Sequence, residues 1–198
     1  MVAAYVARHP SRSYTLNRLG DRFPDFIALS GGSLSRSSFV ADLARLELLV
    51  TEVFDAPETR PVTSRALERI PAEAWAGARL VPIAALRLCE LAWPAGEWLD
   101  ARESGRRPAP RKRATRYVLY RRNYGVRRLT LEPAAFELLG LLVRGKALGA
   151  AVKSILGRHP SAETKLQAWF RDWTRAGLFR AVERAPARRR HAGPGRIR

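Results

Sequence analysis

The second half of the chain reads as a β-hairpin followed by three helices, and this order constrains its fold more than any other feature. Two apolar-rich segments, 117–120 and 126–131, flank the turn Arg122-Asn123-Tyr124-Gly125. Asn and Gly tolerate the positive φ that such a tight turn requires. We therefore predict an α+β protein, with helices over residues 134–143, 147–156 and 162–176.

Each of these three helices has a boundary signal. Pro133 suits the first position of the first helix, and Gly157 closes the second. Ser161 is a good N-cap for the third helix, and Gly177 ends it before a closing strand over 178–183. Four apolar residues of the third helix follow at i, i+3, i+4 and i+7, which predicts that they lie in the core: Leu166, Trp169, Phe170 and Trp173.

The first part of the chain reads as helical. Residues 1–28 predict a helix, a turn and a second helix that Ser13 or Thr15 caps. A polar loop over 30–35 reads as a linker, and 37–54 is the strongest helix of this half. The apolar stripes are Leu16, Leu19, Phe23, Phe26 and Ile27 in the second helix, and Leu43, Leu46, Val50 and Phe54 in the third.

The pattern changes near Ala78, after a short helix predicted over 63–69. Residues 80–83 and 86–93 look like extended segments around a turn, and 96–102 like one helical turn. A basic Pro/Gly loop follows over 103–116. The predicted division is a helical N-terminal domain over 1–78, a winged-helix-like α/β domain over 79–184 that contains this loop and the hairpin 117–131, and a disordered basic tail over 185–198.

Positive charge is concentrated in the second half. The whole chain has 36 Lys and Arg against 18 Asp and Glu, for a net charge of +18. Residues 1–103 hold 12 Arg and 13 acids, a net of −1, whereas residues 104–198 hold 24 basic residues and 5 acids, a net of +19. An arginine bias alone can reflect genome composition. The uneven distribution suggests an anionic partner for the second half, either nucleic acid or an acidic protein or peptide.

Several classes of protein are disfavoured by what the sequence lacks. It has no apolar run of about 18 residues and no signal-peptide pattern at its start, so we expect a cytoplasmic chain without a membrane contact. Cys89 is the only cysteine and can form no disulfide within the chain. With His9, His159 and His191 it cannot build a zinc site of standard spacing. Motifs of catalysis and of dinucleotide binding are missing, so we expect no enzyme activity, no catalytic residue, no metal and no cofactor.

The hairpin holds the first candidate binding residues. Tyrosines and arginines alternate along it, and they are either half-buried strand residues or part of a binding edge. A strand edge rich in Tyr and Arg can accept an extended peptide as an added strand. The candidate peptide-binding residues are Arg116, Tyr117, Leu119, Tyr120, Arg121, Arg122 and Tyr124.

A second hypothesis is DNA binding by the last two helices. The helix over 147–156, the turn 157–160 and the helix over 162–176 could form a helix-turn-helix. Asp172 weakens this interpretation, because it places an acid on the proposed recognition helix. The candidate DNA-binding residues are Arg158, Lys165, Arg171 and Arg175.

The first half resembles the HvfC/BufC-like family, which is often described as a DNA-binding domain family. The resemblance is carried by packing residues: Tyr5, His9-Pro10-Ser11, Leu16, Leu19-Gly20, Phe23, Phe26, Asp42-Leu43-Ala44-Arg45-Leu46-Glu47 and Phe54-Asp55-Ala56. The extended segment over 80–93, the hairpin and the helices after it are also similar to the family, so the resemblance covers residues 1–183. The chain departs from the pattern at Leu48-Leu49, where the family has Trp-Ala. It also lacks the helical stretch with a Tyr-Arg-x-Asn-like motif that usually precedes Tyr5.

The resemblance implies a function that composition does not show. Members of the family look like non-catalytic partners of multinuclear iron enzymes, which oxidise cysteine residues of ribosomally made precursor peptides, as in methanobactin biosynthesis. By this resemblance the chain is an accessory subunit of ribosomal peptide natural-product biosynthesis. It binds the iron oxidase and helps to present the precursor peptide. Its alternative function is that of a DNA-binding, regulator-like protein.

Overall fold

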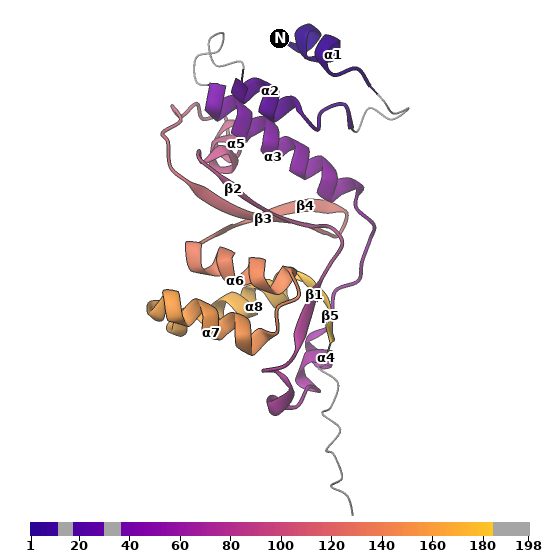
Figure 1. Cartoon of the computed structure of the whole chain (residues 1–198), viewed down its shortest axis with the longest axis vertical. Coiled ribbons are helices and arrows are strands. Elements are labelled where there is room, and N and C mark those ends of the chain that lie inside the picture. Colours follow the sequence, from indigo (N-terminus) through magenta and orange to yellow (C-terminus); the bar gives the residue numbers. More distant parts are fainter. Residues whose placement is uncertain (12–17, 30–36, 184–198) are drawn as a thin grey trace, which may run out of the picture.

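A three-stranded antiparallel sheet lies between two layers of helices (Figure 1). The computed structural model describes residues 1–11, 18–29 and 37–183, and these confirm the predicted α+β fold class. Strand β3 is central and pairs with a neighbour on each side. In spatial order the strands are β2 (Leu86–Leu91), β3 (Thr115–Arg122) and β4 (Gly125–Leu131).

Both faces of this sheet are buried, and successive side chains of β3 therefore all enter a core. Val118 of β3 pairs with Leu88 of β2 and packs with one layer of helices. Tyr117 pairs with Cys89 and packs with the other layer. Residues 117–120 are buried without interruption for this reason. A strand covered on both faces reads as a continuous apolar run.

Helices α3 (Ser37–Asp55) and α5 (Ala95–Glu103) cover the first face of the sheet (Figure 1). The predicted long helix is confirmed, and the single helical turn predicted after Gly96 is a full nine-residue helix. Because α3 belongs to the first part of the chain, its buried side chains form one core with the strands of the second part. This core contains Leu46, Val53, Ala85, Cys89, Leu91, Ala95, Tyr117 and Leu119.

The buried face of α3 differs from the predicted stripe. Val50 and Phe54 are 36% and 58% exposed, whereas Leu46 and Val53 are fully buried. Residues one position apart on a helix point about 100° away from each other, so the face that includes Val53 turns Phe54 toward solvent. The sequence has apolar residues on both flanks of α3, and only contact with the sheet selects between them.

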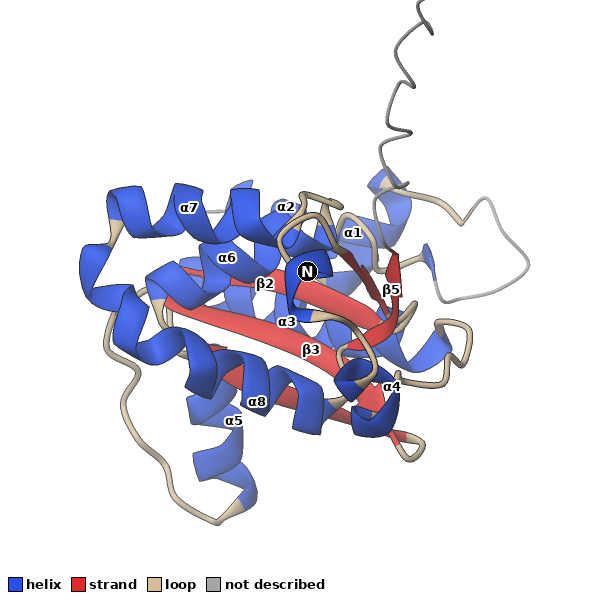
Figure 2. Ribbon diagram, turned by 90° about the horizontal axis from the view of Figure 1, so that it is seen from below, coloured by secondary structure: helices blue, strands red, loops and turns tan. Residues whose placement is uncertain are grey.

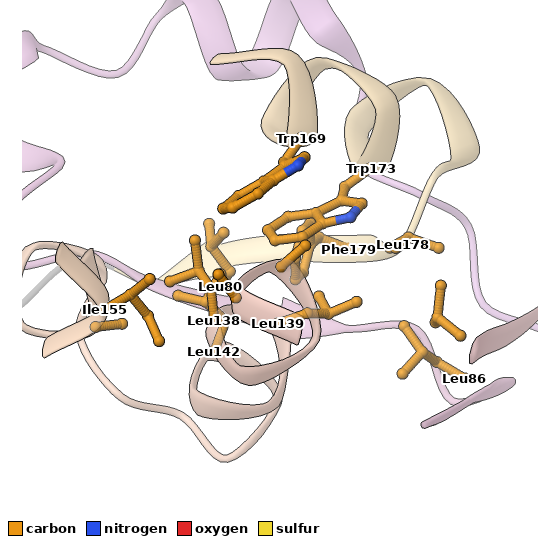
Figure 3. Close-up of a cluster of buried hydrophobic side chains, with 14 of the residues drawn as sticks. Leu80, Leu86, Leu138, Leu139, Leu142, Ile155, Trp169, Trp173, Leu178 and Phe179 are labelled. Carbon is orange, nitrogen blue, oxygen red and sulfur yellow. The ribbon is translucent and has the colours of Figure 1, made fainter. Parts of the chain in front are cut away.

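Helices α6, α7 and α8 cover the second face of the sheet, as the view from below shows (Figure 2). The predicted order of a hairpin followed by three helices is thus present. Trp173 is 1% exposed and Trp169 is 9% exposed, which confirms that both indoles lie in the core. Figure 3 shows both pointing from α8 toward the leucines of α6. The elements of this layer are α6 (Pro133–Val143), α7 (Leu148–Arg158), the 3-10 helix η3 (Pro160–Lys165) and α8 (Leu166–Ala176).

The boundaries of these helices follow the sequence with two exceptions. Pro133 occupies the first turn of α6, and Gly177 ends α8 with a φ of 74°, as expected of a left-handed C-cap. Ser161 does not cap the third helix. It lies inside the 3-10 turn that Pro160 begins, and this turn comes before α8. Helix α7 continues past Gly157 to Arg158.

The tetrapeptide Arg-His-Pro-Ser occurs twice in the sequence, at residues 8–11 and 158–161. In the structure both copies end a helix. His9 follows α1 (Val2–Arg8) with φ −131° and ψ 70°, and His159 follows α7 with φ −134° and ψ 73°. The same residues thus produce the same chain reversal, because proline disfavours a helical conformation in the residue before it.

A small second sheet and short helices complete the fold. Strand β5 returns from α8 to pair antiparallel with β1, with Leu80 opposite Val182. The short helix predicted over 63–69 is present as α4, and the extended segments predicted over 80–83 and 86–93 are strands over 79–82 and 86–91. These elements are α2 (Phe23–Leu29), α4 (Ser64–Glu68), η2 (Ala72–Ala74), β1 (Arg79–Pro82) and β5 (Phe179–Glu183).

Some predictions fall on residues that the structure does not describe. The proposed caps Ser13 and Thr15, the loop over 30–35 and the tail over 185–198 are among them. The second helix begins only at Phe23, and Leu19 lies in a turn before it, where its carbonyl accepts a hydrogen bond from Tyr5. The division of the chain at residue 78 stays a prediction.

The basic loop before the hairpin occupies residues 104–114, slightly fewer than predicted. It contacts α5 at two points. The indole Nε1 of Trp98 donates to the Pro108 carbonyl at 3.1 Å, and Arg113 pairs with Glu97 at 2.5 Å. None of the helices in the described ranges combines the length and the apolar character needed to span a bilayer.

Candidate functional site

Three of the predicted peptide-binding residues are buried in the central strand. Tyr117 and Leu119 have no exposed area, and Tyr120 is 6% exposed. The main chain of β3 pairs with β2 on one side and with β4 on the other. The binding edge expected on this part of the hairpin is therefore not on β3. The sequence did not reveal this arrangement because β2 is separated from β3 by α5 and a long loop.

The side chains of Tyr117 and Tyr120 on β3 pack in the hydrophobic core. Burial raises the pKa of both the Tyr117 and the Tyr120 phenol. The Tyr117 hydroxyl is buried near Thr115 and the main chain of Gly96, but it makes no hydrogen bond of normal geometry. The guanidinium of Arg128 lies over its ring, 5.4 Å from the centroid. These contacts are those of a packed residue.

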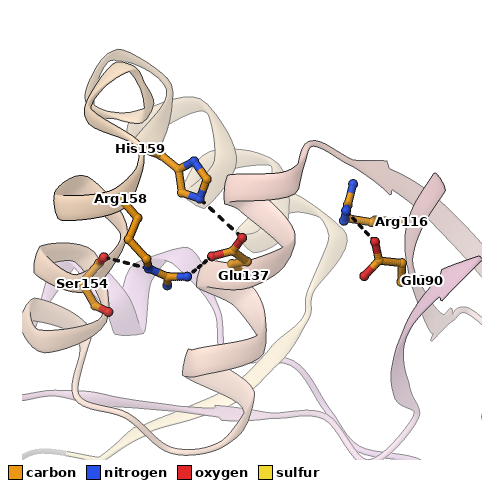
Figure 4. Close-up of polar contacts among 6 residues, drawn as sticks. All are labelled: Glu90, Arg116, Glu137, Ser154, Arg158 and His159. Carbon is orange, nitrogen blue, oxygen red and sulfur yellow. Dashed lines mark hydrogen bonds and ion pairs between the residues drawn. The ribbon is translucent and has the colours of Figure 1, made fainter. Parts of the chain in front are cut away.

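Two of the candidate arginines are already engaged. Arg116 forms an ion pair with Glu90 at 2.5 Å, across β3 and β2 (Figure 4). Arg121 donates to the carbonyl of Phe54 at the end of α3. Arg122 differs, because its guanidinium lies against Gly177, where any Cβ would collide with it. It therefore reaches the C-terminal end of α8, and no ion pair holds it among the described residues.

Tyr124 occupies the tip of the hairpin and is 80% exposed. The two central residues of the turn, Asn123 and Tyr124, have φ of 50° and 62°, as in a type I′ turn. The sequence favoured positive φ at Asn123 and Gly125, but Gly125 follows the turn. A tyrosine in this conformation costs about 1 kcal/mol or more relative to glycine. An exposed aromatic side chain that is retained at this cost is a candidate contact residue.

The free edge of the hairpin is on β4. Arg122 and Gly125 flank the two-residue turn and pair with each other, so the residues of β4 that bond to β3 are 125, 127, 129 and 131. The amide of Arg121, the residue opposite Val126, agrees with this pattern, because it points away from β4 and donates to the Ala85 carbonyl. The main-chain groups of Val126, Arg128 and Thr130 consequently point away from the sheet. Among the described residues they have no main-chain partner.

A groove runs between this free edge and α8. It has a volume of about 530 Å³. Leu129 lies on its strand side, and the indoles of Trp169 and Trp173 lie on its helix side. The groove is lined by Tyr120, Arg122, Arg127, Leu129, Thr130, Leu131, Glu132, Ala135, Trp169, Asp172, Trp173, Arg175 and Ala176.

The two ends of the groove have different charge. At one end Lys165 pairs with Glu132 at 2.5 Å and joins the start of α8 to the end of β4. At the other end, near the hairpin turn, Arg122 lies against Gly177. Helix α8 therefore runs antiparallel to β4. Arg127 faces the groove near this second end, and no ion pair holds it among the described residues.

A second basic hollow continues from the turn end of the groove. It has a volume of about 470 Å³ and lies between the hairpin tip and the segment 58–64. Arg122 and Arg175 line both this hollow and the groove. Arg60 and Arg121 add to its positive charge, and Glu58 also belongs to its lining.

The other face of β4 holds α5. Arg128 donates to both oxygens of Asp100 at 2.7 Å and to the Gly96 carbonyl at 2.9 Å. A Cβ at Gly96 would lie 2.5 Å from Arg128 Nε, so only glycine allows this approach. Arg128 is thus committed to a structural contact, and the groove face is the one left open.

The candidate DNA-binding residues are distributed around α7 and α8. Arg158 pairs with Glu137 and Lys165 pairs with Glu132, so acids oppose both. Arg175 is exposed and lies 4.0 Å from Asp172. Arg171 is exposed on α8 outside the groove. No continuous row of unpaired cations follows from these contacts.

Cys89 is engaged in packing, and His159 lies beside a carboxylate. Burial, with the Asp42 carboxylate as a smaller cause, raises the pKa of the Cys89 thiol to about 11. A buried thiol of this kind is a poor nucleophile. His159 Nε2 lies 3.4 Å from Glu137, whose other oxygen binds Arg158 (Figure 4). Across the described residues, no three His, Cys, Asp or Glu side chains form a potential metal-binding group.

Neither a scan against protein-family models nor a search of curated proteins found a match to this chain. The resemblance to the HvfC/BufC-like family therefore stays a prediction.

Sequence reasoning named three residues of the groove, Tyr120, Arg122 and Arg175, and missed the others. The tryptophans of α8 were predicted in the core and do pack there, and both also belong to the lining of the groove, although Trp169 is only 9% and Trp173 only 1% exposed. Arg127 and Thr130 were not candidates, because the pairing partner of each hairpin strand was unknown. The adjacent charged residues Arg127 and Arg128 within a strand that otherwise contains Val and Leu were a sequence signal of an edge.

Proposed function

We propose that this protein is a non-catalytic accessory subunit that binds an extended peptide as a fourth strand on β4. The free edge of β4, facing a groove walled by α8, is the observation that carries the proposal. Its outward amides at Val126, Arg128 and Thr130 have no main-chain partner among the described residues. An added strand would satisfy them, and the groove would receive every second side chain.

The open edge is otherwise a liability. An exposed strand edge is a template for pairing with other chains, and proteins usually block it with charges, bulges or a covering element. Beside β4 the groove of about 530 Å³ lies between the strand and α8, and we propose that one extended chain occupies it. The apolar wall formed by Leu129, Trp169 and Trp173 would stabilise that chain by burial of its side chains.

The partners in the proposal come from the family resemblance. In it the peptide is a ribosomally made precursor, and a multinuclear iron oxidase acts on it while this subunit presents it. The subunit itself would act in the cytoplasm and supply no catalytic group. The net charge of +19 over residues 104–198 supports an acidic peptide as ligand.

DNA binding is the competing function. The same positive charge predicts weak DNA binding at low salt under either hypothesis, because phosphate contacts depend on counterion release. The acids opposite Arg158 and Lys165 argue against a dedicated phosphate-binding face. Binding that survives about 150 mM salt and prefers one sequence would favour the DNA-binding function.

The test uses a proline on the outward side of the edge. Thr130→Pro removes one outward amide but no bond to β3, a placement that edge strands tolerate. Thr130→Val is the matched control, since it keeps the amide and the β-branched shape. A random library of 12-residue peptides displayed on phage is selected on the immobilised full chain, and both variants are compared.

The proposal predicts peptides that bind the wild type and Thr130→Val but bind Thr130→Pro at least tenfold more weakly. The variants must first show the same unfolding midpoint within the error of the measurement. If selection yields no peptide with this dependence on Thr130, the accessory-subunit proposal is wrong.

A further inference from the structure

We infer that the groove selects peptides with the pattern apolar-x-acidic-x-acidic, written from the N-terminus to the C-terminus. This inference rests on the proposed function and adds the chemistry of the ligand. The apolar position lies beside Leu129 and the indoles of α8. The two acidic positions lie beside Arg127 and Arg122, toward the hairpin turn.

The charges of the groove separate into paired and unpaired groups. Glu132 pairs with Lys165 at 2.5 Å, and Asp172 lies 4.0 Å from Arg175. Arg122 and Arg127 are then left as the cations that line the groove without an ion pair among the described residues. Both guanidinium groups lie near the Tyr120 phenol, which is neutral at pH 7 as any phenol is and therefore forms no ion pair with them. A carboxylate of the ligand could form an ion pair with each of these two guanidinium groups.

The strand geometry fixes the spacing. Side chains of β4 at 127, 129 and 131 point to the groove face, as do the cross-strand partners Tyr120 and Val118. Residues two apart on one face of a strand are about 6.6–6.8 Å apart. Arg122 lies opposite Gly125, which is two residues from Arg127 on β4 and faces the same side of the sheet. A peptide beside β4 therefore meets the apolar wall, Arg127 and Arg122 at successive alternate residues.

The direction follows from the sheet. Every pairing in it is antiparallel, and antiparallel pairing is slightly more stable than parallel pairing. An antiparallel peptide enters at the end of β4 near Glu132 and leaves near the turn. Its apolar residue then precedes its acidic residues. The basic hollow with Arg60 and Arg121 would receive further acidic residues after the pattern.

The first test reads the sequences of the phage-selected peptides that depend on Thr130. The inference predicts enrichment of an apolar residue followed by acids two and four positions later. The second test uses fluorescein-labelled 11-residue peptides with a Ser/Thr/Gln background. One has Leu at position 4 and Asp at positions 6 and 8. The other has the same composition with Asp at positions 5 and 7, which moves both acids to the opposite face.

The peptide with acids at positions 6 and 8 should bind at least tenfold more tightly, as measured by fluorescence polarisation. The double variant Arg122→Glu/Arg127→Glu should lose this preference. It should instead bind a peptide with Lys at positions 6 and 8. The matched control is Arg171→Glu/Arg180→Glu, which changes the net charge equally at exposed positions outside the groove. It should keep the preference.

The outcomes separate this inference from the proposed function. If Thr130-dependent peptides are found without the pattern, or if the charge swap does not rescue binding, the inference is wrong and the peptide-binding function stands. A preference for the reversed order, with the acids before the leucine, would overturn the antiparallel direction. If no Thr130-dependent peptide exists, both fail.

Discussion

Replacing Trp173 with alanine should strongly destabilise the layer formed by helices α6, α7 and α8. Trp173 is 1% exposed and sits among the leucines of α6, with Phe170 packed edge-on at 5.2 Å between centroids (Figure 3). A buried tryptophan hides about 150–250 Å², which corresponds to about 4–6 kcal/mol at 25 cal/mol per Å². Measured core truncations of this kind cost about 3–5 kcal/mol. For a chain of this length the melting temperature should fall by about 6–20 °C.

The assay is thermal and urea unfolding followed by circular dichroism. Phe54→Ala is the matched control, since this ring is 58% exposed and its loss should change stability by less than about 0.5 kcal/mol. If Trp173→Ala does not fold at all, Trp173→Phe should fold with a smaller loss of about 1–2 kcal/mol. Equal melting temperatures for Trp173→Ala, Phe54→Ala and wild type would refute the assigned core.

Three further predictions concern the turn, the alkaline limit and the C-cap of α8. Tyr124→Gly should raise the stability by about 1 kcal/mol in urea unfolding, because φ is positive there; a loss of stability would contradict the assigned turn. Because burial raises the pKa of Cys89 from 9.0 to about 11, the contribution of its neutral thiol to stability is present below pH 9 and is lost as the pH rises toward 11. The raised pKa of Tyr117 acts in the same direction, but only above the ordinary phenol pKa of 10. The urea midpoint should therefore fall over this range, and less steeply for Cys89→Ala; parallel curves would argue against the burial. Gly177→Ala should cost about 1–2 kcal/mol or more, since it combines a φ of 74° with a collision with Arg122, and an unchanged unfolding midpoint would exclude this contact.

The parts of the fold that could be predicted are those with local signals. Pro133 and Gly177 set the ends of α6 and α8 through their own backbone conformations, which depend on no distant residue. The hairpin was visible because its turn and both its strands are adjacent in the sequence. The core position of Trp173 followed from its spacing with Leu166 and Phe170 along one helix.

The parts that could not be predicted depend on contacts between distant segments. The pairing of Cys89 with Tyr117 places β3 between β2 and β4, so β3 has no free edge. No residue of the hairpin itself indicates this pairing. The same is true of α3, where apolar residues on two flanks left the buried face undecided until the sheet selected Val53 over Phe54. The groove combines one strand and one helix about forty residues apart, so its lining could not be assembled from either segment alone.

The most direct test of the proposed function measures the amide hydrogens of β4. The amides of Val126, Arg128 and Thr130 point outward, whereas those of Arg127 and Leu129 bond to β3. Hydrogen exchange is measured by NMR with and without a phage-selected, Thr130-dependent peptide. The proposal predicts that bound peptide slows exchange at the three outward amides and leaves the two inward ones nearly unchanged. Slowed exchange confined to α7 and α8, with no change at 126, 128 and 130, would contradict the addition of a strand to β4.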